Sequence, residues 1–257
     1  MNKLTANYHT HTYRCNHATG EDREYAEQAV KAGLKILGFS DHSPMIFPSG
    51  HTSGFRVPAD KALDYFQSIR ALRDEFKNEL EIHVGVEVEY YPDMFDDYLD
   101  YIGSFGCEYL ICGQHFIFDE EKGQSSFKQT DDESVLAAYF DNLILACQSG
   151  KFLYIAHPDL INFVGSEEIY AHHARRFLKE AAKCSVPLEI NRLGLEDERH
   201  YPRDSFWQCC AEEGNPVIIG LDAHSPGPVG DLPMHRRCIE YAEKFGLNLV
   251  KDNLLNL

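Results

Sequence analysis

Short apolar runs that alternate with longer amphipathic stretches constrain the fold of this chain more than any other feature. Seven runs rich in β-branched and aromatic residues have the length of strands, and a stretch of helical periodicity follows each one. We predict strands at residues 4–9, 36–40, 81–87, 109–113, 152–156, 187–190 and 216–220. We predict helices at residues 21–32, 59–76, 94–105, 132–149, 166–184, 203–213 and 233–245. This alternation favours a parallel sheet covered by helices.

The number of strand–helix units favours closure of this sheet into a barrel. A chain of 257 residues has the length of one (β/α) barrel, and no change of composition divides it. We therefore predict a single α/β domain over residues 1–257, with an open, doubly wound sheet as the alternative topology. The longest irregular regions follow strands, which places them at the C-terminal face of a barrel, where active sites form. These regions are residues 42–58, 116–130 and 191–201.

Charge and composition argue against several classes of partner. The formal net charge is −17, so we expect no surface for nucleic acid or for an anionic membrane. Most of the carboxylates are expected on solvated helix faces. The sequence has no apolar run of about 18 residues and no apolar core of a signal peptide near its first residues. Its eight cysteines form no CxxC pair, which favours a reduced, cytoplasmic protein.

Histidines and carboxylates recur where the predicted strands end. His9 and His11 form a His-x-His pair, and Asp222 and His224 repeat its spacing near the other end of the chain. Since side chains alternate along a strand, residues two apart share one face. A single pair of this kind is weak evidence of a metal site, but a barrel brings all strand ends together. The nine candidate ligands are His9, His11, His17, His42, Glu87, His115, His157, Asp222 and His224.

This mixture of imidazoles and carboxylates favours zinc, iron or manganese over magnesium or calcium. Nine ligands are too many for one ion, so two or three ions fit better. The alternative is a barrel mouth that is merely rich in polar residues. Among the other histidines, we expect His172, His173 and His235 on the surface and His83 in a packing role. His51 and His200 lie in mouth loops and could contact a substrate.

The order of these motifs resembles that of a known family. The segments Tyr-His-Thr-His at 8–11, Cys-Asn-His-Ala at 15–18, Phe-Ser-Asp-His-Ser-Pro at 39–44, Gly-Val-Glu at 85–87, His-Pro at 157–158 and Asp-Ala-His at 222–224 carry the resemblance. Together they resemble the polymerase and histidinol phosphatase (PHP) family, and most closely its monofunctional histidinol-phosphate phosphatases. The resemblance implies a distorted (β/α)7, TIM-like barrel with three divalent metal ions, which would be Zn, Mn or Fe.

The resemblance also implies how the nine ligands divide. His9, His11, Glu87 and Asp222 would hold the first ion. Glu87 would bridge to a second ion that His115 and His157 complete, and His17, His42 and His224 would hold the third. Three positions depart from the family pattern: Gln114 replaces a small residue, Glu89 replaces an aspartate, and Arg192 stands early in the segment 191–195.

The implied activity is hydrolysis of L-histidinol phosphate to L-histidinol and phosphate, a step of histidine biosynthesis. We expect a hydroxide that bridges two ions to attack the phosphorus atom, with Glu87, Asp222 and His224 as the catalytic residues. Arginine matches phosphate in a bidentate geometry, so the candidate substrate contacts are Arg192 first, then Arg199, Arg203, Arg56 and also His200. Asp41 and Asp159 could orient imidazoles or cap the next helix. Acidic residues near the mouth would suit a positively charged substrate; they are Glu89, Asp119, Glu120, Glu196 and Asp197.

Three other functions stay open at this point. The chain could be a PHP phosphoesterase that acts on a nucleotide, a phosphotyrosine protein or a nucleic-acid end, although the acidic charge disfavours nucleic acid. It could store or sense metal without turnover. It could also be a metal-dependent amidohydrolase, since those enzymes carry His-x-His on a barrel as well. The sequence does not predict the oligomeric state.

Overall fold

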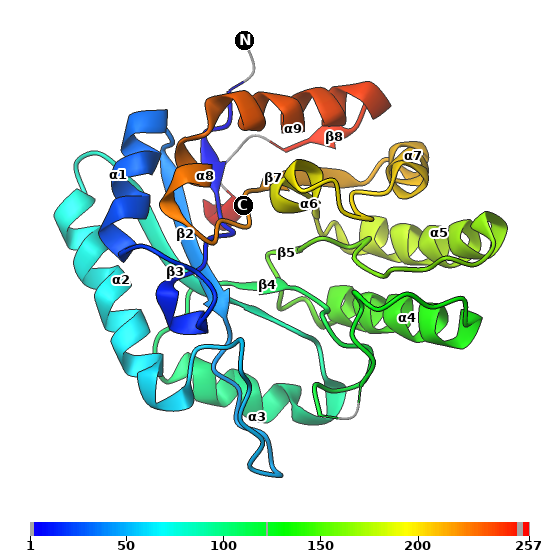
Figure 1. Ribbon diagram of the computed structural model, residues 1–257, viewed down its shortest axis with the longest axis horizontal. Coiled ribbons are helices and arrows are strands. Elements are labelled where there is room, and N and C mark those ends of the chain that lie inside the picture. Colours follow the sequence, from blue (N-terminus) through cyan, green and yellow to red (C-terminus); the bar gives the residue numbers. More distant parts are fainter. Residues whose placement is uncertain (1–2, 122, 251–253, 257) are drawn as a thin grey trace.

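A computed structural model describes residues 3–121, 123–250 and 254–256 of the chain. Its strands form one parallel sheet in chain order from β1 to β8, with helices along the outside (Figure 1). The strands are β1 (Ala6–Asn7), β2 (Ile36–His42), β3 (Glu81–Val88), β4 (Leu110–Cys112), β5 (Tyr154–Ile155), β6 (Leu188–Asn191), β7 (Pro216–Gly220) and β8 (Asn248–Leu249). Because each strand pairs with the next one along the chain, the sheet has no reversal of strand order and is not doubly wound.

The helices follow the strands as predicted. They are α1 (Asp22–Ala32), α2 (Ala62–Phe76), α3 (Pro92–Gly103), α4 (Glu133–Ser149), α5 (Glu167–Cys184), α6 (Arg192–Glu196), α7 (Asp204–Glu213), α8 (Pro226–Gly230) and α9 (Leu232–Phe245), with 3₁₀ turns at Tyr13–Cys15, Ala59–Lys61 and Leu254–Asn256. The α/β, TIM-like fold is confirmed. The elements β8, α6 and α8 were not predicted, because they are short, with two, five and five residues, and because α8 contains two prolines and two glycines. Within the described residues, no helix is long and apolar enough to cross a membrane.

At the C-terminal ends of its strands, the sheet curls so that the first and seventh strands meet. After β1, Thr10 pairs in parallel with Ala223, which follows β7. The amide of His11 donates to the carbonyl of Ala223 at 3.0 Å, and the amide of Ala223 donates to the carbonyl of His9 at 3.3 Å. At the opposite end of β7, β8 pairs with its first residues instead. The C-terminal ends of the first and seventh strands therefore lie side by side, although Thr10 and Ala223 are far apart in the sequence.

The hydrophobic residues divide between the two faces of the sheet. On β3, Ile82, Val84, Val86 and Val88 pack against the helices in the large cluster of the core. A smaller cluster fills the inside of the curled sheet and contains Tyr8, Ile36, Tyr109, Ile111, Tyr154, Ala156, Ile218 and Leu254. Because strand side chains alternate, Glu87 of β3 points away from the helices, toward the inside of the sheet above this second cluster.

Candidate metal centre

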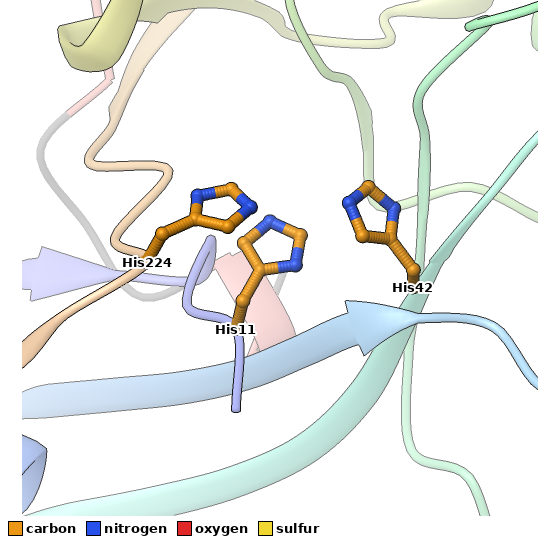
Figure 2. Close-up of side chains that lie close together, drawn as sticks. All are labelled: His11, His42 and His224. Carbon is orange, nitrogen blue, oxygen red and sulfur yellow. The ribbon is translucent and has the colours of Figure 1, made fainter. Parts of the chain in front are cut away.

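The nine predicted ligands meet at the C-terminal ends of the strands. Figure 2 shows His11, His42 and His224, which come from three different strand ends, with their rings turned toward one another. The ring centroids of His11 and His224 are 4.0 Å apart, and those of His11 and His42 are 4.4 Å apart. The ring of His17 lies 4.7 Å from that of His224, and their Nε2 atoms are 3.0 Å apart. Residues from both ends of the chain therefore form one cluster.

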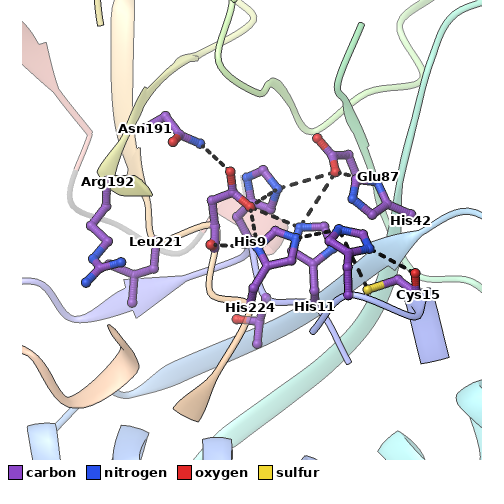
Figure 3. A network of polar contacts seen from close by, with 12 residues as sticks. His9, His11, Cys15, His42, Glu87, Asn191, Arg192, Leu221 and His224 are labelled. Carbon is purple, nitrogen blue, oxygen red and sulfur yellow. Dashed lines mark hydrogen bonds and ion pairs between the residues drawn. The ribbon is translucent and has the colours of Figure 1, made fainter. Parts of the chain in front are cut away.

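Dashed lines join the carboxylate of Glu87 to neighbouring imidazoles of this cluster in Figure 3. The Oε2 atom of Glu87 is 3.5 Å from His9 Nε2, 3.7 Å from His11 Nε2 and 3.1 Å from His42 Nδ1. On the other side, Oε1 is 2.8 Å from His157 Nε2 and 3.5 Å from His115 Nε2. One carboxylate thus faces five imidazoles, which is the geometry expected of a bridging ligand.

Asp222 provides the second carboxylate of the cluster. Its Oδ1 atom lies 3.1 Å from His11 Nε2, 3.6 Å from His9 Nε2 and 3.3 Å from His224 Nδ1. The amide of Asn191 donates to its Oδ2 atom at 3.1 Å. Asp222 has a φ of 47° and His157 a φ of 30°, a left-handed conformation that residues other than glycine adopt rarely and that is common at functional sites.

Oxygen atoms behind the rings fix the orientation of five histidines. The Nδ1 atom of His9 contacts Glu189 at 2.8 Å, and that of His115 contacts Glu89 at 2.9 Å. The remaining Nδ1 contacts are His11 with Asp41 at 3.4 Å, His17 with the carbonyl of Cys15 at 2.9 Å, and His224 with the carbonyl of Asp222 at 3.1 Å. A ring that donates from Nδ1 keeps Nε2 free for a metal ion, and such outer contacts are usual for metal ligands.

The inner atoms of the cluster lack partners of their own. Among the described residues, His9 Nε2, His11 Nε2, His42 Nδ1 and Glu87 Oε2 are buried and accept or donate no hydrogen bond. An unsatisfied buried polar group costs about 1–3 kcal/mol, so four such atoms facing one another call for a bound group. Among the described residues, five sets of three potential ligand atoms lie within 4.8 Å of one another. Four of them consist of predicted ligands, namely His11–His42–His224, His9–Glu87–His157, His9–His11–Asp222 and His42–Glu87–His115, and the fifth is His11–Cys15–Asp41. The donor set therefore fits divalent metal ions.

Charge inside the cluster is distributed unevenly over its members. Burial alone would raise the pKa values of Glu87 and Asp222, but the neighbouring imidazoles hold both well below their usual range. Burial would lower the pKa of His11, yet the neighbouring carboxylates of Asp222 and Asp41 raise it to about 9. For His224, burial and the charge of His11 lower the pKa to about 3. Without metal, protons thus occupy some of the ligands and are excluded from others.

The cluster forms one wall of a cavity of about 460 Å³. The rest of its lining is mostly aromatic, with Phe55, Phe116, Phe127 and Tyr201 beside Leu193, Ser125 and Arg199. A cavity of this size suits a small molecule. The cavity therefore presents polar ligand atoms and flat, apolar side chains next to one another.

Of the five predicted substrate contacts, Arg199 lines this cavity and the others do not. Arg56 and Arg192 are each only 2% exposed. Arg192 pairs with Glu196 at 2.6 Å and lies apart from the cluster in Figure 3. Arg203 stacks on the ring of Tyr170 and donates to the carbonyl of Phe163 at 2.9 Å, while His200 Nε2 contacts the carbonyl of Leu160 at 2.7 Å.

Arginines neutralise much of the acidic mouth that we expected. Glu89 and Glu120 both pair with Arg56, at 2.5 and 2.7 Å, and Asp197 pairs with Arg199 at 2.7 Å. Burial would raise the pKa of Glu89, but the charge of Arg56 and the contact with His115 lower it. These carboxylates are therefore occupied within the protein rather than free for a cationic substrate.

Some expectations about other polar residues were wrong. His173 and His235 are buried, at 8% and 3% exposure, because they fall on the apolar stripes of α5 and α9; only His172 of the three is exposed. His83 is half-buried and pairs with Glu81 and Glu108. Of the two aspartates proposed behind the imidazoles, Asp41 contacts His11, whereas Asp159 accepts from the amide of Arg203 and from Trp207 Nε1 and so holds the start of α7.

Glu189 is the member of the centre that sequence reasoning missed. It is completely buried in β6 and accepts from both His9 and Asn191, each at 2.8 Å. Gly220 of the neighbouring strand makes room for it, because a Cβ there would lie 2.0 Å from Glu189 Oε2. A carboxylate between Leu188 and Ile190 in an apolar strand was the available signal, since such a charge is rarely buried without a partner.

Comparisons with known proteins identify the family of this chain. The model of the family described as "PHP domain" matches residues 7–193. The "Probable histidinol-phosphatase" of Deinococcus radiodurans is 32% identical over 231 residues, covering 86% of this chain and 87% of that protein. The "Histidinol-phosphatase" of Bacillus subtilis is 26% identical over 263 residues, covering 86% of this chain and 94% of the relative.

A solved structure shares the fold. The histidinol phosphate phosphatase of Lactococcus lactis, crystallised as a complex with Zn, L-histidinol and phosphate, superposes with a TM-score of 0.74 at 18% identity, covering 99% of this chain and 98% of that one. With most of its length matched by the family model, and with the strand-end histidines gathered around Glu87, this chain belongs to the PHP domain family.

Proposed function

We propose that this protein is a metal-dependent phosphomonoesterase that hydrolyses L-histidinol phosphate to L-histidinol and phosphate in histidine biosynthesis. The observation that carries the proposal is the cluster around Glu87, in which buried ligand atoms have no hydrogen-bond partner, at a cavity of about 460 Å³. Two relatives named histidinol-phosphatase, at 32% and 26% identity, support the choice of substrate. The fold neighbour bound to Zn, L-histidinol and phosphate supports it further.

We assign the nine ligands to three divalent ions, which would be Zn, Mn or Fe. In this assignment His9, His11, Glu87 and Asp222 hold one ion. His9, His11 and Asp222 form one of the close sets, and Glu87 Oε2 lies 3.5 Å from His9 Nε2. Glu87 uses its other oxygen for a second ion with His115 and His157, and the third set is His17, His42 and His224. Short distances between the ligand atoms support each set, including 2.8 Å from Glu87 Oε1 to His157 Nε2 and 3.0 Å between His17 Nε2 and His224 Nε2.

The residues of the site have different roles in the proposed hydrolysis. When bound, divalent ions make water a nucleophile near neutral pH and offset the charge of the phosphoryl oxygens. Glu87, Asp222 and His224 are the groups closest to the reacting atoms in this proposal. Arg199 lies on the cavity wall and forms an exposed ion pair with Asp197. In this proposal its guanidinium leaves Asp197 and binds a phosphate oxygen. The aromatic wall around Phe55, Phe116 and Phe127 packs on the organic part of the substrate and excludes water.

A steady-state comparison of phosphomonoesters tests this proposal. The protein, supplied with Zn²⁺ or Mn²⁺, is assayed on L-histidinol phosphate, a nucleoside monophosphate, phosphotyrosine and p-nitrophenyl phosphate. We expect kcat/KM to be highest for L-histidinol phosphate by at least about 10-fold, a difference of about 1.4 kcal/mol in transition-state binding. A higher value for another ester would replace the substrate. Saturation with metal but no hydrolysis of any ester would contradict the phosphatase itself and favour metal storage or an amidohydrolase.

A further inference from the structure

Arg56 is a buried cation at the mouth to which the proposed reaction gives no role. It lies after β2 in the loop of residues 43–58 and is only 2% exposed. The amide of its neighbour Val57 donates to the carbonyl of His42 at 3.0 Å, so the end of this loop is tied to a candidate ligand. The guanidinium stacks on Phe55, with its centre 4.6 Å from the ring centroid. Arg56 therefore has a fixed place beside Phe55, which lines the cavity.

Two carboxylates from different segments hold this guanidinium. Arg56 Nη2 donates to Glu89 Oε2 at 2.5 Å, and Nε donates to Glu120 Oε2 at 2.7 Å. The second oxygen of Glu89 contacts Nδ1 of His115 at 2.9 Å. A continuous chain of charged contacts thus runs from the loop at Glu120 through Arg56 and Glu89 to the ring of a candidate metal ligand.

Stability alone is a poor explanation for this arrangement. Removing a guanidinium from water costs several kcal/mol, which its ion pairs offset only when every donor is satisfied. Arg56 Nη1 is buried and has no hydrogen-bond partner within the described part of the chain. A well-packed apolar side chain often stabilises a fold as well as a buried ion pair does. The guanidinium instead orients its partner, because its planar set of N–H donors fixes the rotation of the carboxylate that it binds.

We propose that Arg56 is a positioning residue that orients His115 toward its metal ion through Glu89. By fixing the Glu89 carboxylate, it holds the imidazole plane so that Nε2 faces Glu87, 3.5 Å away. By binding Glu120, it joins the loop of residues 116–121 to the same unit. His51 Nε2 contacts the other oxygen of Glu120 at 3.0 Å, which adds the preceding mouth loop to it. The inference rests on the proposed metal-dependent function and deepens it.

A second triad of the same composition serves as a matched control. At the other end of β3 and β4, Glu108 joins Arg73 to Nδ1 of His83, with 2.9 Å between His83 and the carboxylate. This triad also places a carboxylate between an arginine and a histidine, but no candidate ligand belongs to it. Arg73→Gln therefore removes a guanidinium with the same kinds of partner, though a more exposed one at 34% against 2% for Arg56, without touching the cluster.

Metal affinity is the measurement that tests the role of Arg56. Wild type, Arg56→Gln, Arg56→Lys and Arg73→Gln are stripped with a chelator and titrated with Zn²⁺ against a chromophoric chelator. We expect Arg56→Gln to bind one of its ions about 10–100-fold more weakly, as is usual when the group behind a ligand is lost. Arg56→Lys should lose less, because an ammonium still pairs with Glu89, and Arg73→Gln should bind as wild type does. Wild-type binding of every ion by Arg56→Gln would overturn the proposal.

Further variants and an exchange measurement distinguish a folding defect from a loss of metal positioning. If Arg56→Gln shows no cooperative thermal transition, Arg56→Lys and Glu89→Gln decide instead, and unchanged zinc affinity in both refutes the positioning role. If wild type itself binds no ion, the proposed function fails, and that result is distinct from equal binding by wild type and variant. In wild type, zinc should also slow amide exchange in residues 117–121, and Arg56→Gln should lose that effect; equal protection in both proteins contradicts the coupling.

Discussion

Substitution of Gly113 by alanine should disable the centre without removing any functional group. Gly113 follows β4, and a Cβ built on it would lie 2.0 Å from Oε1 of Glu87 and 2.6 Å from its carboxyl carbon. Ordinary contact of a Cβ begins near 3.4 Å, so the carboxylate must retreat by roughly 1.4 Å, which is 3.4 Å minus the 2.0 Å to Oε1. Metal–ligand distances tolerate only about 0.2 Å. A single methyl group therefore displaces Glu87 far beyond that tolerance.

We expect Gly113→Ala to lose metal and activity together. A misplacement of about 1 Å can cost 100-fold in rate, so kcat/KM on L-histidinol phosphate should fall by at least about 100-fold. Metal content per chain, measured by mass spectrometry after dialysis, should fall in parallel. Gly103→Ala is the control, because a Cβ at Gly103 meets nothing within 4 Å. If Gly113→Ala keeps both its metal and its rate while its thermal transition matches wild type, Glu87 does not bridge ions at this position.

Three further predictions concern the surroundings of the cluster. Glu189→Gln removes the charge behind His9 and should lower metal affinity by about 10–100-fold; a chelator competition that gives the wild-type affinity would contradict this. In the metal-free protein the pKa of His9 is raised well above its usual value and that of His11 to about 9, so both rings hold a proton at neutral pH that a metal ion must displace. Zinc affinity should therefore fall as the pH drops below about 9, with proton release that calorimetry in two buffers detects; pH-independent binding would refute it. Arg199→Ala should raise the KM for the phosphate ester by about 10-fold with unchanged metal content, whereas Arg203→Ala should lower the melting temperature and leave kcat/KM intact; the reverse pattern would exchange their roles.

The fold was predictable because its signals are local and repeated. Apolar runs such as that of β3 and amphipathic stretches such as that of α5 each specify their element, and strict alternation then specifies a parallel sheet. The two-residue β8 and the five-residue α6 and α8 carry too few residues to show any period. Where the curled sheet meets itself, contacts between Thr10 and Ala223 span most of the chain, and no local pattern reports them.

The site was predictable only in its inner layer. Histidines at strand ends stand out in a sequence, so His9, His42 and Glu87 could be named in advance. Of the groups that fix them, Asp41 was named in advance and contacts His11, but Glu189 and Glu89 were not. These two carboxylates act through contacts with one imidazole each, and sequence spacing does not show which ring a carboxylate will meet. Arg56 was expected to bind phosphate because arginines often do, but its two carboxylate partners bury it beside the cluster instead.

In the proposed mechanism, hydrolysis of the phosphate ester depends on a cluster of ions held around Glu87. The most direct test titrates chelator-stripped protein with Zn²⁺ or Mn²⁺ while ion content per chain and hydrolysis of L-histidinol phosphate are measured on the same samples. We expect about three ions per chain at saturation, no activity in the stripped protein, and a rate that returns as the ions bind. Full activity without metal, or a single bound ion with full activity in His157→Ala, would contradict it.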